Sequence, residues 1–207
     1  MCRLLFILLL ASGWAAAHPG RTNSEGCHAG SQPYHCHNGG GQSQSTDSPY
    51  QYDRREYGSW ADQDGDCLST RHEMLESMNT GQVAYSTNGC RVIGGRWLDP
   101  FSGQLYYRAN QVDIDHVVPV AWAHSRGGYA WSSGQKRAFY NDPANLLVVS
   151  SRLNRSKGAQ DPGEWLPPNL AFRCEYVLRF TRVALKYQLL NSNERGRLAR
   201  VQQRVCN

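Results

Sequence analysis

Residues 112–119, VDIDHVVP, decide the fold of this chain. β-Branched residues alternate with polar ones up to His116, a pattern that predicts a strand ending at the histidine. Residues 145–149, NLLVV, predict a second strand after an intervening loop. The serines that follow predict the start of a helix over 151–157, which carries Asn154. The order of elements is therefore strand, strand, helix.

This unit offers the side chains that metal-assisted phosphodiester hydrolysis requires. We expect His116 to be the general base, because an imidazole with a pKa of about 6.5 is mostly neutral at pH 7. Asp115 and Asn154 supply oxygen ligands of the kind that Mg²⁺ binds together with waters and a substrate phosphate. We expect Asn145 to bond across the loop and orient His116. Asp113 shares a strand face with Asp115 and either supports the metal site or makes a structural contact.

Basic side chains lie on or beside the predicted helix at Arg152, Arg155 and Lys157. They are candidate phosphate contacts, and solubility of the helix is an equally good explanation. The whole chain has a formal net charge of +5 at pH 7, and its last third is rich in arginine. A basic surface attracts polyanions through counterion release, so the charge is compatible with a nucleic-acid partner but does not identify one.

The residues above resemble the signature of HNH endonucleases, in which an Asp-His pair is followed by two asparagines. Asp115-His116, Asn145 and Asn154 take these places. Three flanking segments also match: residues 115–119, residues 141–142 and residues 153–158. More loosely, the chain from about Trp60 to Cys206 resembles a group of secreted bacterial proteins that carry this domain.

The resemblance implies a ββα-metal fold, a divalent cofactor and cleavage that leaves 5′-phosphate and 3′-hydroxyl ends. Mg²⁺ is the expected ion, with Mn²⁺ as an alternative. The expected fold class is α+β, with a ββα-metal core at about 107–158 inside one domain over 51–207. Flanking helices and disulfides complete that domain.

The amino-terminal end has the order of a secretory signal. A basic residue, Arg3, precedes an apolar run, and three alanines end at Ala17. A membrane anchor is the rival interpretation, but a spanning helix needs about 20 apolar residues and this run is interrupted early. We therefore expect cleavage after Ala17, export to the periplasm or the medium, and no membrane association afterwards.

Six of the seven cysteines lie beyond that signal, an even number that favours disulfides in an oxidising compartment. Order along the chain favours Cys67 with Cys90 and Cys174 with Cys206. An apolar stripe from about Phe172 predicts a long helix, and residues 191–193 break it before a last helix. An antiparallel pair of these helices brings the last two cysteines together at its open end.

Residues 18–50 are rich in Gly, Ser and His and contain too little apolar surface to fold alone. This flexible tail contains one small motif, formed by Cys27, His28, His35, Cys36 and His37. The motif resembles a Cys/His segment of other secreted bacterial proteins. Two interpretations have equal weight: a Zn²⁺ site that orders the tail, or a local disulfide with idle histidines.

Elements outside the central unit are also predicted. Thr70 to Glu73 has the spacing of a capping box and predicts a helix near 69–79. Short runs at 96–98 and 104–107, separated by glycines and Asp-Pro, predict short strands between turns.

Together these features predict an exported, metal-dependent endonuclease that hydrolyses DNA with little sequence preference, because no module for reading bases is visible. One alternative keeps the chemistry and changes the substrate to RNA or single-stranded DNA. A second alternative is a secreted protein that binds zinc or nucleic acid without cutting it. An immunity or inhibitor partner is not identified by the sequence.

Overall fold

The structure is a computed structural model that describes residues 27–28, 35–36 and 51–207. The expected signal at 1–17, most of the tail at 18–50 and His37 lie outside these residues. Two short strands of the tail are described, β1 (Cys27–His28) and β2 (His35–Cys36), which pair antiparallel with Cys27 opposite Cys36. This backbone pairing is compatible with both a disulfide and a zinc site.

The described chain combines short strands with helices, and its fold class is mixed α+β, as predicted. The helices are α1 (Thr70–Ser77), α2 (Val120–Ser125), α3 (Ser133–Tyr140), α4 (Ser151–Lys157), α5 (Arg173–Lys186) and α6 (Ser192–Val205). The strands of the domain are β3 (Ala84–Tyr85), β4 (Val92–Leu98), β5 (Leu105–Arg108), β6 (Val112–His116) and β7 (Leu146–Ser150). Short 3₁₀ helices are η1 (Arg54–Tyr57), η2 (Gly128–Ala130), η3 (Pro143–Asn145) and η4 (Leu170–Phe172).

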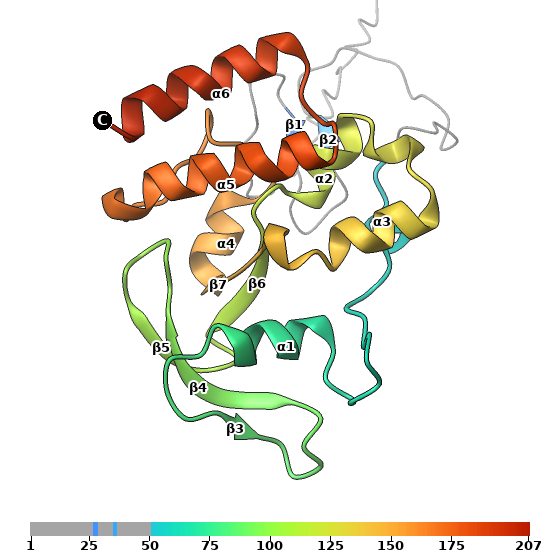
Figure 1. The fold of residues 1–207 in the computed structure, drawn as a ribbon, viewed down its shortest axis with the longest axis vertical. Coiled ribbons are helices and arrows are strands. Elements are labelled where there is room, and N and C mark those ends of the chain that lie inside the picture. Colours follow the sequence, from blue (N-terminus) through green and yellow to red (C-terminus); the bar gives the residue numbers. More distant parts are fainter. Residues whose placement is uncertain (1–26, 29–34, 37–50) are drawn as a thin grey trace, which may run out of the picture.

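An antiparallel pair of strands, β6 and β7, lies in the middle of the molecule between two apolar clusters (Figure 1). Successive side chains of a strand point to opposite faces, so each face of the pair packs against its own cluster. Ile114 and Val148 belong to the smaller cluster, with residues of α1 and β4. Leu147 and Val149 belong to the larger cluster, with residues of the helices. The strand pair is therefore covered on both faces, and polar groups placed on it are buried.

The helix after β7 completes the predicted order of strand, strand and helix. The hydroxyl of Ser150 accepts a hydrogen bond from the backbone N–H of Leu153, so a serine caps α4 as expected. α4 packs against both β6 and β7. The long connection between the two strands contains α2 and α3, which the sequence pattern did not predict.

The carboxyl-terminal helices form the predicted antiparallel hairpin, with α6 lying along α5 at one end of the molecule (Figure 1). Asn191 and Glu194 form a capping box that starts α6. A disulfide joins Cys174 to Cys206 at the open end of the hairpin, which confirms the predicted pairing.

The opposite end of the molecule is a three-stranded antiparallel sheet in the order β3-β4-β5, with α1 against it (Figure 1). A disulfide joins Cys67 to Cys90, as predicted. The predicted capping box is wrong, because Ser69 takes the N-cap position and makes no side-chain cap. The hydroxyl of Thr70 instead donates to the carbonyl of Ala61.

Within residues 27–28, 35–36 and 51–207, no helix combines the length and the apolar character needed to cross a bilayer.

Candidate active site

His116 is the last residue of β6, and its imidazole is buried, with 5% of the residue exposed. Its Nε2 lies 2.8 Å from the carbonyl oxygen of Tyr140. A carbonyl only accepts, so Nε2 carries the proton and donates it to this bond. In the neutral ring the lone pair is then on Nδ1. The structure thus fixes both the orientation of the ring and the nitrogen that can accept a proton.

The charge state of His116 follows from its surroundings. The pKa of His116 is lowered to about 3, chiefly by burial and to a smaller extent by the positive charges of Arg54 and Lys157, while the hydrogen bond to Tyr140 opposes the shift. The imidazole of the protein without substrate is therefore neutral at pH 7.

Two aromatic rings hold the imidazole in place. The indole of Trp60 stacks on His116 with ring centroids 5.3 Å apart and an angle of 9° between planes. The ring of Tyr140 lies 4.6 Å from the imidazole and 4.7 Å from the indole. A general base that is locked by packing needs no reorganisation before it acts.

Asp115 precedes His116 and is also buried, with 3% exposed. The ammonium of Lys157 donates to its Oδ1 at 2.8 Å and to the carbonyl oxygen of His116, also at 2.8 Å. Burial raises the pKa of Asp115, and the charge of Lys157 opposes that shift. The second oxygen, Oδ2, is buried and has no hydrogen-bond partner. A buried acceptor without a donor is unfavourable unless another group satisfies it.

A second side-chain contact joins β6 to α4, beside the pair of Asp115 and Lys157. Asp113 accepts from the hydroxyl of Ser151 at 2.9 Å and from the amide nitrogen of Asn154 at 3.0 Å. Asn154 therefore bonds to Asp113, whereas the sequence analysis placed it with Asp115 on one metal ion. Its amide oxygen takes no part in that bond, since Nδ2 is the donor. Asp113 makes a structural contact to a predicted ligand, which is one of its two expected roles.

Asp115 and His116 leave β6 on opposite faces, because successive side chains of a strand alternate. Asp115 contacts α4, and His116 contacts Trp60 and Tyr140. A ligand that touches both side chains must therefore lie beside β6 or at its carboxyl end.

The buried side chain of Asn145 holds the turn that follows His116. Its Oδ1 accepts from the backbone N–H of Val118 at 2.8 Å, and its Nδ2 donates to the carbonyl of Val118 at 3.3 Å. Its own carbonyl accepts from the N–H of Val117. Asn145 thus bonds across the loop, as expected.

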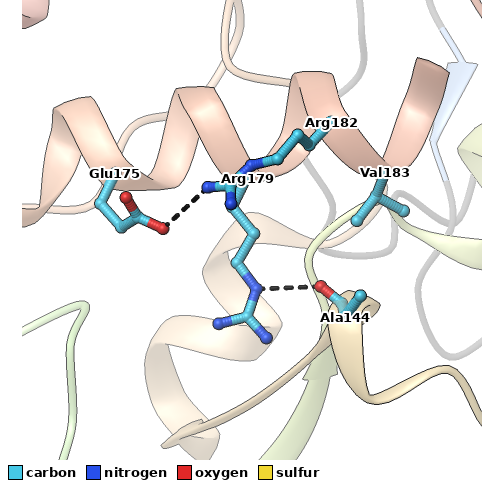
Figure 2. Close-up of a pocket in the computed structure, with 5 residues that line it drawn as sticks. All are labelled: Ala144, Glu175, Arg179, Arg182 and Val183. Carbon is cyan, nitrogen blue, oxygen red and sulfur yellow. Dashed lines mark hydrogen bonds and ion pairs between the residues drawn. The ribbon is translucent and has the colours of Figure 1, made fainter. Parts of the chain in front are cut away.

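Arg179 of α5 supports the segment around Asn145 from outside. Its guanidinium donates to the carbonyls of Pro143, Ala144 and Leu146, which bracket Asn145. Figure 2 shows this side chain in a surface hollow of about 180 Å³, where a neighbouring arginine, Arg182, pairs with Glu175. Both cations are engaged by the protein itself, and none of the predicted site residues lines the hollow. Arg179 therefore braces the loop, and the hollow around it is separate from the candidate site.

The three basic residues grouped by the sequence analysis lie in different settings. Arg152 and Arg155 are exposed on α4 and form no ion pair within the described part of the chain. Lys157 is fully buried and paired with Asp115, so it organises the site and is not a surface contact for phosphate.

Sequence reasoning missed Arg54, Trp60 and Tyr140. Arg54 and Trp60 come from a segment far upstream of the motif, and no local pattern marks them. Tyr140 had a weak signal, because it directly precedes Asn141-Asp142, which match the HNH flank.

Another group of carboxylates, Asp62, Asp64 and Asp66, has oxygen atoms within 4.8 Å of one another on the surface. Asp62 accepts from the backbone N–H groups of Gly65 and Cys67. These bonds account for the cluster as the frame of a turn.

Comparison with known proteins gives the family of the chain. The family described as GmrSD restriction endonucleases, C-terminal domain, matches residues 69–198. The chain is thus an HNH-like nuclease domain by class, and it belongs to this GmrSD C-terminal domain family. An uncharacterized secreted protein of Arthroderma benhamiae is 33% identical over 140 residues, which cover 67% of each chain. No solved structure matches the chain.

Proposed function

We propose that the protein is an exported, divalent-metal-dependent endonuclease that hydrolyses DNA phosphodiester bonds with low sequence preference. The observation that carries the proposal is the setting of His116. Its neutral imidazole is held through Nε2, with Nδ1 as the acceptor, and the preceding residue of β6, Asp115, is a buried carboxylate with an unpartnered oxygen. Membership of a nuclease family supports the reaction class. The description of a relative as secreted supports export.

In this proposal Nδ1 of His116 accepts a proton from a water molecule as its oxygen attacks the phosphorus atom. The bond from phosphorus to O3′ breaks, and the departing oxygen takes a proton from solvent, which yields 5′-phosphate and 3′-hydroxyl ends. The negative charge of the bound phosphate raises the pKa of the imidazole from its low value in the free protein. That shift makes His116 a stronger base when substrate is present.

The residues around Asp115 fit a divalent ion. The unpartnered Oδ2 of Asp115 and the amide oxygen of Asn154 are hard donors, which suit Mg²⁺ or Mn²⁺. These two residues would hold the ion, while Lys157 on Oδ1 keeps the carboxylate oriented. When bound, the ion stabilises the charge that develops on the phosphate and the departing oxygen.

The low sequence preference rests on the absence of a base-reading module in the sequence. Arg152 and Arg155 are exposed on α4, beside the site, and are proposed to contact backbone phosphates. Such contacts position a nucleic acid but carry no sequence information.

The test is cleavage of supercoiled plasmid by oxidatively folded protein, with Mg²⁺, with EDTA, and with His116→Ala alongside. We expect nicking that requires Mg²⁺ and is lost in the variant. Nicking that persists in EDTA would refute the metal dependence. An intact plasmid beside degraded RNA would change the substrate to RNA. A gel shift of DNA whose length stays unchanged in Mg²⁺ would favour a binding protein.

A further inference from the structure

A positively charged side chain from outside the family-matched region reaches the candidate site. Arg54 lies in η1, upstream of residue 69, where the family match begins. Its Nη2 donates to the hydroxyl of Tyr140 at 3.1 Å, and its guanidinium carbon lies 5.2 Å from the centre of that ring. The backbone carbonyl of the same tyrosine accepts the hydrogen bond from Nε2 of His116. One residue therefore holds both the proposed base and this cation.

The segment that carries Arg54 is fixed to α3 by several contacts. The side chain of Asn141 accepts from the N–H of Ala61 at 2.9 Å and donates to the carbonyl of Ser59 at 3.2 Å. Lys136 of α3 forms an ion pair with Glu56 of η1. Since α3 also contributes Tyr140, the position of Arg54 is set relative to the imidazole.

Arg54 has no carboxylate partner among the described residues. Its neighbour Arg55 pairs with Asp53 at 2.7 Å, whereas Arg54 bonds to tyrosine hydroxyls. Lys157, the other cation at this site, is already paired with Asp115, so Arg54 is the cation that can take an added anion at its unused donors. The charge arrangement is thus that of an anion site.

We infer that Arg54 binds a phosphate of the substrate strand at the edge of the His116 site, an inference that rests on the proposed function. The guanidinium has five N–H donors in a planar fork, and the bonds to Tyr140 and Tyr52 use two of them. The remaining donors match two oxygens of one phosphate. A segment outside the family domain thus supplies a substrate contact.

The experiment measures DNA binding and cleavage by Arg54→Gln, with Arg55→Gln as the matched control from the same 3₁₀ helix. Binding of a labelled duplex is measured in the His116→Ala background across a series of salt concentrations. We expect Arg54→Gln to weaken binding about 10- to 100-fold and to lower the salt slope by about 1, because one phosphate contact is lost. Arg55→Gln should change neither. Arg54→Lys should restore the salt slope and part of the affinity, because a lysine keeps the charge but not the fork.

Two failures are distinguishable. If the unsubstituted protein cleaves DNA while Arg54→Gln and Arg55→Gln bind with equal affinity and equal salt slope, the inference about Arg54 is wrong and the proposed function stands. If the unsubstituted protein neither binds nor cleaves nucleic acid, the proposed function fails and the inference falls with it. Arg54 is exposed, so its replacement should leave the fold intact, and a circular dichroism spectrum checks this.

Discussion

Two antiparallel strand arrangements in this molecule differ in what covers them. The β6–β7 pair lies between two apolar clusters, and every residue of β7 is buried. The β3–β4–β5 sheet buries one side against α1 and exposes large apolar side chains on the other, among them Ile93 at 54% and Tyr107 at 57%. Burial on both faces makes polar groups on β6 and β7 depend on partners supplied by the protein.

The two arrangements also hold one histidine each. His72 of α1 is half-buried, and its Nδ1 accepts the backbone N–H of Val92 in β4. His116 donates from Nε2 to the carbonyl of Tyr140, which leaves Nδ1 as the acceptor nitrogen of the ring. A histidine whose acceptor nitrogen already bonds the backbone is a structural residue, whereas His116 retains the acceptor that a general base needs. This difference in hydrogen bonding supports the proposal that the reaction takes place at the strand pair with both faces covered.

Breaking the buried ion pair should have the largest effect on stability. Lys157→Met leaves the carboxylate of Asp115 buried without its partner, and we expect the free energy of unfolding to fall by about 3–5 kcal/mol in urea titrations. Lys136→Met is the control: Lys136 is buried, but its partner Glu56 is half-exposed, so the carboxylate left behind stays hydrated and the loss should be about 1 kcal/mol or less. Equal losses in the two variants would contradict the assigned difference in burial.

A double replacement separates stability from function at the same place. Asp115→Leu with Lys157→Met removes both charges, so much of the lost stability should return. Cleavage should remain absent, because a proposed metal ligand is missing. Cleavage by this double variant would remove Asp115 from the site.

Removing either disulfide should have a large effect, and its size should be similar at the end with the three-stranded sheet and at the end with the α5–α6 hairpin. The bridges Cys67–Cys90 and Cys174–Cys206 span 23 and 32 residues. Chain entropy predicts losses of about 3–4 kcal/mol for each paired Cys→Ala replacement, with a difference near 0.3 kcal/mol. Urea unfolding measures both. A difference much larger than this would show that one region unfolds separately from the other.

The smallest effect should come from shortening a strand isoleucine. Ile114→Val in β6 trims a side chain that is 5% exposed, and we expect a loss of about 0.5–1.5 kcal/mol. Ile93→Val in β4 trims an exposed side chain and should change the free energy of unfolding by less than about 0.5 kcal/mol. Comparable losses would mean that the outer face of β4 is covered in solution.

Much of the fold follows from local patterns in the sequence. The strands β6 and β7, the serine cap of α4 and the paired carboxyl-terminal helices all arise from residue spacings of a few positions. The Cys174–Cys206 bridge followed from the predicted hairpin. By contrast, the spacing from Thr70 to Glu73 predicted the helix α1 correctly but not its cap, because Thr70 bonds to Ala61 and not to its own helix.

The site was predictable in its motif but not in its contacts. Spacing indicated His116 and Asn145, since both belong to one local signature. The pairing of Asp115 with Lys157 depends on how α4 lies along β6, which the sequence does not specify. Arg54 contacts Tyr140 across 86 positions of the chain, and no periodicity relates residues so far apart.

The most direct measurement compares the two histidines. Single-turnover cleavage of a labelled duplex is measured for His116→Ala and for His72→Ala, each with enzyme in excess and Mg²⁺ present. The account predicts a fall of about 10²- to 10⁴-fold for His116→Ala, because a general base is lost, and a nearly unchanged rate for folded His72→Ala. A rate for His116→Ala equal to that of the unsubstituted protein would contradict the account.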